Sequence, residues 1–207
     1  MAITSKKRGK FITLEGMDGA GKSTHIPTII AALKARGIEV VSTREPGGTR
    51  LGEQLRALLL HDTMHVETET LLMFAARREH IETVIAPALK RGAYVLSDRF
   101  TDATYAYQCG AKGVSANKIK QLEKWVQGKL QPDLTLLFDV PVEISMKRLT
   151  TAREPDKFER EDAKFFEKLR SAYLTRAEEN PTRFRVVDAN QALDKVKVIV
   201  ENIVSTI

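Results

Sequence analysis

The chain has few cysteines, prolines and glycines for its 207 residues, and it has no long hydrophobic run. Its single cysteine, Cys109, excludes a disulfide framework and a multi-cysteine metal site, and it fits the reducing cytoplasm. Seven prolines and twelve glycines are too few for a collagen-like chain or a linker. No apolar run approaches the roughly 18 residues that cross a membrane, and no signal-peptide pattern follows Met1. We therefore expect a cytoplasmic protein with no membrane partner.

Neither sign of charge dominates, because 33 Lys and Arg side chains against 27 Asp and Glu give a formal net charge of +6. The basic residues are spread along the chain, and no segment interleaves them strongly with aromatic side chains, so we expect no nucleic-acid partner. With 43% hydrophobic and 29% charged residues, the composition is that of a globular protein and excludes intrinsic disorder.

Apolar runs rich in β-branched residues alternate with amphipathic stretches, which is typical of βαβ units and a parallel sheet. We expect one α/β domain over residues 1–207, with a doubly wound parallel sheet of five strands flanked by helices. Strands are expected at 11–15, 38–43, 94–97, 134–138 and 184–187, and helices at 22–36, 51–61, 67–91, 101–108, 115–127, 142–150, 160–179 and 191–205. Pro87 predicts a kink in the helix at 67–91. The charged segment 151–160 is expected to form an exposed flap.

The residues from Gly16 to Ser23, GMDGAGKS, fit the pattern G-x-x-x-x-G-K-[ST] between an expected strand and an expected helix. The glycines let backbone N–H groups converge on phosphate oxygens, and the helix N-terminus and Lys22 add positive charge. The hydroxyl of Ser23 suits a Mg²⁺ ion that bridges two phosphates. The motif predicts a P-loop protein that binds a nucleoside triphosphate.

A phosphate loop alone leaves the reaction open among switches, motors and kinases. Asn117-Lys-Ile-Lys120 is not the N-K-x-D of GTPases, and the strands ending at Asp98 and Asp139 carry no adjacent glutamate of the motor-ATPase kind. Asp98 is instead followed by Arg99 at the carboxyl end of a strand, the edge that faces the ligand crevice in an open α/β sheet. There we expect the carboxylate to hold magnesium through water and Arg99 to pair with a second phosphate.

Other polar residues near this edge have two interpretations. Thr104, Tyr107 and Gln108 are three to four residues apart and share a helix face, which suits contact with a base or a sugar, but also ordinary core packing. The segment Glu45–Thr49 is either a plain turn or part of the site. Met73-Phe74 with Arg77 is either core beside arginines or a stacking surface with a guanidinium that contacts a base.

These motifs in this order make the chain similar to the thymidylate kinase family, whose members use ATP to phosphorylate dTMP to dTDP. The resemblance covers nearly all of the chain, through FITLEGMDGAGKST at 11–24, TREPGGT at 43–49, DRFTD at 98–102, AYQ at 106–108, QPDLT at 131–135 and Val187-Asp188. It implies a P-loop NTPase-type fold with a short LID insert at about 151–160, a Mg²⁺ cofactor, ATP and dTMP as ligands, and a homodimer. The helices at 51–61 and 67–86 are the candidate interface.

The resemblance also implies a set of site residues. ATP is expected at Gly16, Met17, Asp18, Gly19, Ala20, Gly21, Lys22, Ser23, Thr24, Arg148 and Arg153. dTMP is expected at Asp18, Glu45, Pro46, Phe74, Arg77, Arg99, Thr104, Tyr107 and Gln108. Lys22, Asp18, Arg99 and Arg153 are the expected catalytic residues, and Ser23 and Asp98 are the expected metal-binding residues.

Within the dTMP set, the resemblance assigns each residue a part of the nucleotide. Asp18 is similar to the carboxylate near the sugar hydroxyl and the metal, and Arg99 to the arginine on the phosphate. Tyr107 is similar to the tyrosine under the deoxyribose, which leaves little room for a 2′-OH. Arg77 is similar to the arginine that hydrogen-bonds thymine, and Thr104 and Gln108 match positions that face the base.

The chain departs from the family pattern in the base pocket and in the LID. Counting back from Arg77, the stacking aromatic falls on Met73, and Phe74 one residue later is our candidate. Gly19 stands where some members carry a charge-stabilising arginine, so the LID is expected to supply it, through Arg153 or through its alternatives Arg148 and Arg160. Asp156-Lys157 replaces the common Asp-Arg pair, which disfavours bidentate contact there.

The expected mechanism is direct in-line transfer of the γ-phosphoryl group of ATP to the dTMP phosphate. The acceptor oxygen is already anionic, so the reaction needs positioning and charge neutralisation rather than a strong base. The residues alone leave two alternatives open. One is a kinase for another nucleotide or nucleoside on the same fold, and the other is a switch that binds ATP without phosphorylating a small molecule.

Overall fold

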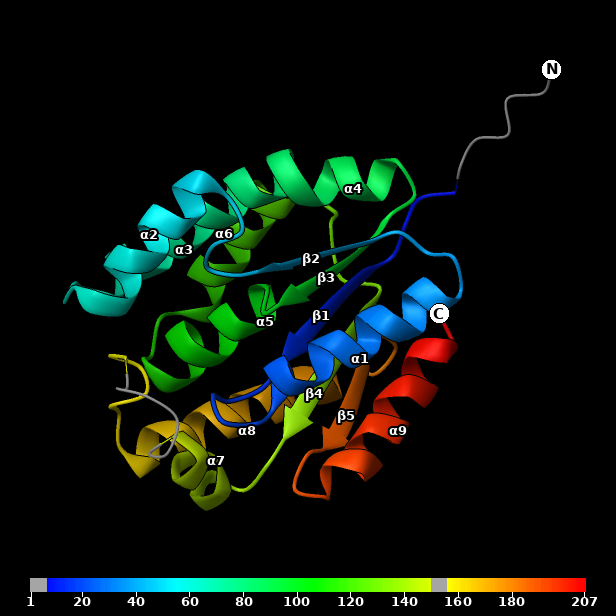
Figure 1. Ribbon diagram of the computed structural model, residues 1–207. Helices are drawn as coiled ribbons and strands as arrows, with labels where there is room; N and C mark the ends of the chain where they lie inside the picture. Colours follow the sequence, from blue (N-terminus) through cyan, green and yellow to red (C-terminus); the bar gives the residue numbers. More distant parts are fainter. Residues whose placement is uncertain (1–6, 150–155) are drawn as a thin grey trace.

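The computed structural model describes residues 7–149 and 156–207. Five parallel strands form one sheet in the order β2-β3-β1-β4-β5 (Figure 1). They are β1 (Phe11–Glu15), β2 (Val40–Arg44), β3 (Tyr94–Asp98), β4 (Leu134–Asp139) and β5 (Phe184–Asp188). The predicted sheet is confirmed, with strand ends within two residues of those expected. β3 and β4 lie on opposite sides of β1, so the strand order changes direction at β1. Sheets of this kind bind ligands in a crevice at such a point, here at the carboxyl ends of β1, β3 and β4.

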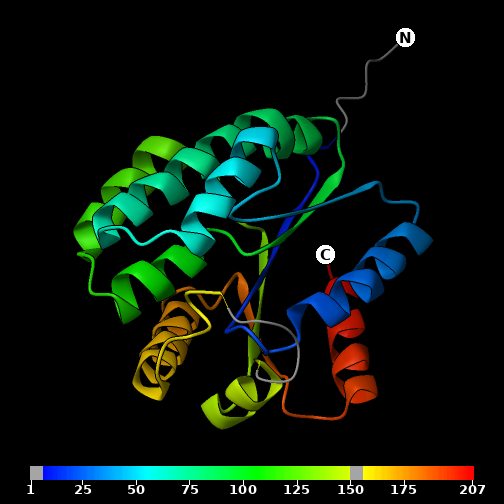
Figure 2. The ribbon, with the colours of Figure 1, turned by 60° about the vertical axis from the view of Figure 1, so that its left-hand side comes forward.

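Helices cover both faces of the sheet (Figures 1 and 2). On one face α1 (Lys22–Ala35) packs against α9 (Leu193–Ser205). The other face carries α3 (Val66–His80), α5 (Thr101–Thr104), α6 (Ala116–Gln127) and α8 (Ala163–Glu179). In addition, α2 (Arg50–His61) lies against α3, and α7 (Val142–Leu149) lies against α8. No helix within the described residues is long and apolar enough to cross a membrane.

The helix expected at 67–91 is divided into three parts. After α3, the π-helix η1 (Ile81–Ile85) leads into α4 (Ala86–Lys90), and Pro87 lies in the first turn of α4. Proline has no backbone N–H to donate, and the first turn of a helix needs none. The wider π-helical turn therefore accommodates Pro87 at the point where the sequence predicted a kink.

The helix expected at 101–108 is also partly a π-helix. It consists of α5 followed by η2 (Tyr105–Ala111), which packs against α8. Such wide turns are frequent at functional sites, and this one stands directly beyond the end of β3.

The core lies between the sheet and its helices, and β1 is buried along its whole length. Ile12 and Leu14 belong to one hydrophobic cluster and Phe11 to the other, as the alternation of side chains along a strand requires. At the end of β1 the chain passes so close to β4 that a Cβ on Gly16 would lie 2.3 Å from the carbonyl oxygen of Phe138. Gly16 also has a φ of 130°, which favours glycine. The phosphate loop therefore leaves the sheet where only glycine fits.

Candidate active site

The GMDGAGKS segment connects β1 to α1 and packs against α7. Gly19 has a φ of 76°, and a Cβ there would lie 2.6 Å from the carbonyl oxygen of Ser145. The buried Nζ of Lys22 donates hydrogen bonds to the carbonyl oxygens of Gly16 at 3.0 Å and Met17 at 2.8 Å. Burial and the nearby charge of Arg99 lower the pKa of Lys22. The loop thus holds its lysine at the N-terminus of α1, where an anion is favoured.

Ser23 and Asp98 line one cavity beside the phosphate loop, together with residues of β2 and α2. The Oδ1 atom of Asp98 is buried and has no hydrogen-bond partner among the described residues. A hydroxyl and a carboxylate with a free oxygen fit a Mg²⁺ ion, which takes oxygen ligands and keeps most of its shell for water and phosphate. The residues present therefore suit the expected metal.

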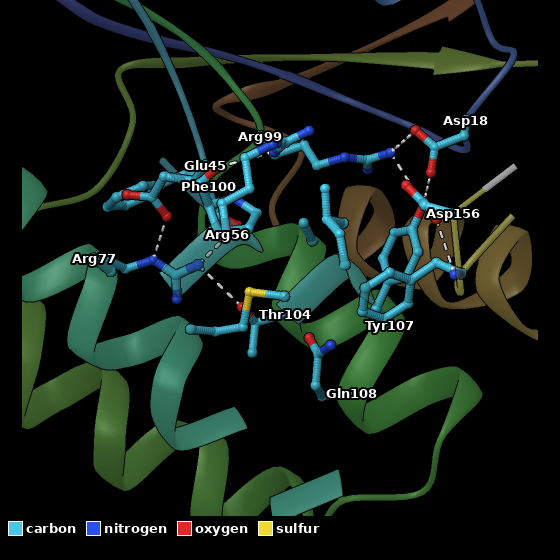
Figure 3. A pocket seen from close by; sticks show the side chains of 15 residues that line it. Asp18, Glu45, Arg56, Arg77, Arg99, Phe100, Thr104, Tyr107, Gln108 and Asp156 are labelled. Carbon is cyan, nitrogen blue, oxygen red and sulfur yellow. Dashed lines mark hydrogen bonds and ion pairs between the residues drawn. The ribbon is translucent and has the colours of Figure 1, made fainter. Parts of the chain in front are cut away.

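Arg99 stands at the junction of the phosphate loop and a second pocket (Figure 3). One guanidinium nitrogen donates to the carbonyl oxygen of Gly16 at 2.9 Å and to the hydroxyl of Tyr173 at 2.8 Å. The other donates to Oδ1 of Asp18 at 2.5 Å and to the hydroxyl of Tyr107 at 3.0 Å. The Tyr107 hydroxyl donates in turn to Oδ2 of Asp18 at 2.8 Å. These contacts fix the guanidinium in one position.

The same contacts set the protonation of Asp18. Burial opposes ionisation of its carboxyl group, but the charges of Arg99 and Lys22 and the hydrogen bond from Tyr107 outweigh that effect. They hold the pKa of Asp18 below its usual range. Asp18 is therefore an anion at neutral pH and an acceptor for any hydroxyl that enters the pocket.

The backbone at Arg99 is left-handed, with a φ of 69°, which is costly for a residue with a side chain. The buried carboxyl group of Glu15 stabilises this turn by accepting a hydrogen bond from the backbone N–H of Phe100 at 2.7 Å. Its other oxygen accepts from the Tyr173 hydroxyl at 3.0 Å. Burial and the negative charge of Asp102 raise the pKa of Glu15 to about 8.

The second pocket extends from the phosphate loop toward α3 (Figure 3). Asp18 and Arg99 lie at one end, and Arg77 lies at the other. Eight of the nine residues expected at dTMP line it: Asp18, Glu45, Pro46, Arg77, Arg99, Thr104, Tyr107 and Gln108. The fold therefore brings together residues that are up to 90 positions apart in the sequence.

Arg77 forms the far end of the pocket and is itself buried. Its Nε donates to Glu45 at 2.7 Å, and one terminal nitrogen donates to the Thr104 hydroxyl at 3.0 Å and the Phe100 carbonyl at 3.2 Å. The other terminal nitrogen is buried and has no hydrogen-bond partner among the described residues. A buried donor without an acceptor is costly, so a ligand that supplies an acceptor would be stabilised here. Glu45 also contacts His80 Nδ1 at 2.9 Å.

Phe74 is the one expected dTMP residue that the pocket excludes. Met73 lies on the pocket wall instead. Phe74 is 1% exposed and belongs to the core, and the centre of its ring lies 4.8 Å from Cζ of the Arg77 guanidinium. Residues 73 and 77 are four apart and share a helix face, but residue 74 is turned by about 100° toward the sheet. The preference for Phe74 over Met73 therefore disagrees with the structure.

No dTMP contact was expected at several residues that line the pocket, namely Arg56, Leu60, Phe100, Ala103, Asp156 and Phe158. Arg56 and Leu60 are four residues apart on α2, a spacing that places them on one face and was available as a signal. Phe158 is an aromatic residue in a charged segment, and its ring lies edge-on to Tyr107 with centres 5.6 Å apart. Part of the expected flap thus closes one side of the pocket.

The expected LID arginines are placed differently. Arg153, the preferred one, lies outside the described residues. Arg148 on α7 donates hydrogen bonds to the carbonyl oxygens of Gly19 at 3.2 Å and Ala189 at 3.3 Å, so it lies against the phosphate loop. Arg160 is exposed.

The parallel sheet, the phosphate loop and the adjoining pocket define a P-loop nucleotide-binding protein in which a nucleoside triphosphate and a second anionic ligand can meet at Arg99. The family model of thymidylate kinase matches residues 14–200. The thymidylate kinase of Methylobacillus flagellatus is 69% identical over 92% of this chain and 94% of that protein. That of Cupriavidus metallidurans is 62% identical over 97% of this chain and 100% of that protein.

Among solved structures, the thymidylate kinase of Ehrlichia chaffeensis has the same fold, with a TM-score of 0.75 and 32% identity. That match covers 95% of this chain and 98% of the other. The chain belongs to the thymidylate kinase family and is a nucleoside monophosphate kinase.

Proposed function

We propose that this protein transfers the γ-phosphoryl group of ATP directly to dTMP and so produces dTDP for dTTP synthesis. The observation that carries this proposal is the position of Arg99, which bonds to the phosphate loop through Gly16 and to the second pocket through Asp18 and Tyr107. A cation at this junction faces both phosphate groups that react. Membership of the thymidylate kinase family supports dTMP as the acceptor.

ATP is proposed to bind along the phosphate loop, with its phosphates on the backbone N–H groups of residues 16–24 and on Lys22. Arg148, which contacts Gly19, is placed to approach the same nucleotide. Ser23 and Asp98 would hold Mg²⁺, which neutralises phosphate charge when it is bound. The free Oδ1 of Asp98 supports this assignment.

The dTMP phosphate is proposed to bind Arg99, and the sugar hydroxyl to bind the ionised Asp18. The ring of Tyr107 would lie under the deoxyribose. The Tyr107 hydroxyl donates a hydrogen bond to Asp18 at 2.8 Å, and the ring packs against Phe158 and Tyr173, so it is held in one position. A ring held in this way leaves no room to adapt to a 2′-OH. The pocket therefore favours deoxyribonucleotides.

The thymine base is proposed to lie between Met73 and the residues of α5 and η2. The free terminal nitrogen of Arg77 supplies a donor for a base carbonyl, and Glu45 keeps the guanidinium in place. Thr104 and Gln108 supply further polar contacts. Pro46 lines the wall near Glu45.

The transfer step needs no general base, because the attacking phosphate oxygen is already an anion. Lys22 and Arg99 neutralise charge from the two sides, and Arg153 is proposed to supply charge from the LID. Phe158 helps to exclude water on the pocket side, which protects ATP from hydrolysis.

We also propose that the protein acts as a homodimer in the cytoplasm. Leu51 and Leu58 on α2 and Leu71 on α3 are 45%, 45% and 54% exposed, and α2 and α3 pack side by side. Exposed leucines on adjoining helices fit an apolar interface. Sedimentation at micromolar concentration should give twice the chain mass, whereas a monomer would contradict this part of the proposal.

Incubation with γ-labelled ATP, Mg²⁺ and dTMP tests the proposed reaction. The label should appear in dTDP, and Lys22→Met should abolish the transfer because the loop loses its cation. Release of the label only as inorganic phosphate would contradict the kinase and favour a nucleotide-dependent switch.

A further inference from the structure

A buried carboxylate lies behind the part of the pocket where the base is proposed to bind, and it has no role in the function described above. Glu69 on α3 is 2% exposed and does not line the pocket. Its Oε1 accepts hydrogen bonds from Gln108 Nε2 and from Lys112 Nζ, both at 2.9 Å. Its Oε2 accepts from Lys112 Nζ at 3.0 Å and lies 3.0 Å from Lys157 Nζ. Two side chains from η2 and its C-terminal end and one from the expected flap thus converge on one acid.

The two lysines keep this acid ionised. Burial alone would raise the pKa of Glu69, but the hydrogen bonds from Gln108, Lys112 and Lys157 outweigh it and hold that pKa below its usual range. Lys157 is itself held by the carbonyl oxygen of Asp62 at 3.0 Å. A buried carboxylate that is paired with lysines in this way is stable, whereas removal of the carboxylate or of one lysine would leave the remaining charge buried without its partner.

An ionised carboxylate accepts hydrogen bonds and donates none. The amide of Gln108 must therefore turn its nitrogen toward Glu69, which leaves its carbonyl oxygen on the other side. Gln108 lines the pocket (Figure 3). Within residues 7–149 and 156–207 its amide bonds through Nε2 to Glu69, and its Oε1 makes no hydrogen bond. The fixed amide consequently presents a free acceptor to a bound base.

We infer that Glu69 is a positioning residue for base selection, because it fixes the Gln108 amide with its carbonyl toward the acceptor nucleotide. A base with a ring N–H, such as thymine or uracil, can donate to that carbonyl. Cytosine has a ring acceptor at the same position and would face it without a hydrogen bond. Sites that leave a buried polar group unpaired discriminate strongly against the wrong ligand. This inference rests on the proposed binding of dTMP in this pocket.

The substitution Glu69→Gln should reverse the amide of Gln108. The new amide oxygen is needed by Lys112 and Lys157, so its nitrogen must face Gln108. Gln108 then turns its carbonyl toward residue 69 and its nitrogen toward the pocket, where it matches the ring acceptor of cytosine. The preference for dTMP over dCMP should fall by about tenfold or more.

The experiment compares the Kd of dTMP and of dCMP by calorimetry in the wild type and in Glu69→Gln. Glu67→Gln is the matched control, since Glu67 lies on the same helix, is exposed and pairs with Lys118 at the surface. That control should keep the wild-type ratio of the two Kd values. A purely structural role of Glu69 would weaken both nucleotides together and leave the ratio unchanged.

Gln108→Leu gives a second test, because it removes the amide through which Glu69 is inferred to act. It removes both polar ends of the amide, so Glu69→Gln should change the Kd ratio no further in the Gln108→Leu background. An unchanged ratio in Glu69→Gln, or an equal change with and without Gln108, would overturn the inference. A wild type with no preference for dTMP would instead contradict the proposed function itself.

Discussion

The guanidinium of Arg99 and the carboxylate of Asp18 form an ion pair, with 2.5 Å between nitrogen and oxygen, where the phosphate loop meets the second pocket. Asp18 belongs to the loop after β1, and Arg99 follows β3, the neighbouring strand. The register of the two strands sets Leu14 opposite Asp98, so the sheet itself brings the pair together. The contact joins the two halves of the site.

Arg99→Lys should lower kcat/KM for dTMP by about a hundred- to a thousandfold, a loss typical of removing one preorganised donor. Lysine keeps the charge, but it cannot hold Gly16, Tyr173, Asp18 and Tyr107 at once. Arg91→Lys is the control, because Arg91 is exposed and pairs with Glu39 at the surface. Steady-state kinetics with varied dTMP measures the effect, and a lysine variant within threefold of the wild type would contradict the role of Arg99.

Tyr107 should determine the choice between deoxyribose and ribose. Tyr107→Ala opens space under the sugar, so the ratio of kcat/KM for dTMP to that for the ribonucleotide analogue should fall. Tyr107→Phe keeps the ring and should keep the ratio, while the loss of the hydrogen bond to Asp18 lowers the rate with both nucleotides. Equal ratios in the alanine and phenylalanine variants would refute steric selection by the ring.

Glu45→Ala should destabilise the protein by about 3–5 kcal/mol, because it leaves Arg77 buried without its partner. Both side chains of this pair are at most 5% exposed. Glu82→Ala removes the exposed pair between Glu82 and Arg78 nearby and should cost only about 0.5 kcal/mol. Urea denaturation measures both, and similar small losses would show that the Arg77–Glu45 pair contributes little.

The stability of the protein should depend on the pH through Glu15. The pKa of Glu15 is raised from 4.5 to about 8 by burial and by Asp102, so the folded state binds this proton more tightly than the unfolded state. Its contribution is complete below pH 4.5 and is lost as the pH rises through about 8. The free energy of unfolding of the wild type should therefore fall over this range relative to Glu15→Gln, which does not titrate.

Denaturation curves at several pH values between 5 and 8 measure this difference, and Glu39→Gln at the surface serves as the control. Parallel pH profiles of the wild type and Glu15→Gln would contradict the assigned protonation of Glu15.

The LID arginine is tested by three alanine variants of the candidates named from the sequence. Arg153→Ala should reduce kcat by about a hundredfold or more with little change in the Kd of dTMP, because its charge is needed only during transfer. Arg148→Ala and Arg160→Ala should reduce kcat much less. Single-turnover kinetics decides among them, and an unchanged kcat in Arg153→Ala would refute its role.

The sheet and the phosphate loop could be predicted because their signals are local. The apolar runs predict the strands, and the glycines of residues 16–21 predict the phosphate loop. Strands that alternate with helices along the chain then form a parallel sheet. The location of Asp98 and Arg99 at the site could be predicted, because the carboxyl end of a strand in such a sheet borders the ligand crevice.

The contents of the pocket beyond these residues depend on packing between distant elements. Phe74 and Met73 both suit a stacking position by composition. The four-residue spacing sets Met73 on the same helix face as Arg77, and the packing of α3 against Phe11 and Phe100 buries Phe74. Arg56 reaches the pocket from α2, and Glu69 acts through Gln108 on another element. The spacing of Arg56 and Leu60 places both on one helix face, but no local pattern tells that this face borders the pocket or that Glu69 contacts Gln108.

The central claim is tested most directly by ADP formation from MgATP with dTMP, dGMP, dCMP, deoxythymidine or no acceptor. We predict strong stimulation by dTMP and rates near background with the other four samples, because the site requires a phosphate on Arg99 and a thymine beside Arg77. Equal rates in every sample, including the one without an acceptor, would contradict the account and identify an ATPase or a switch.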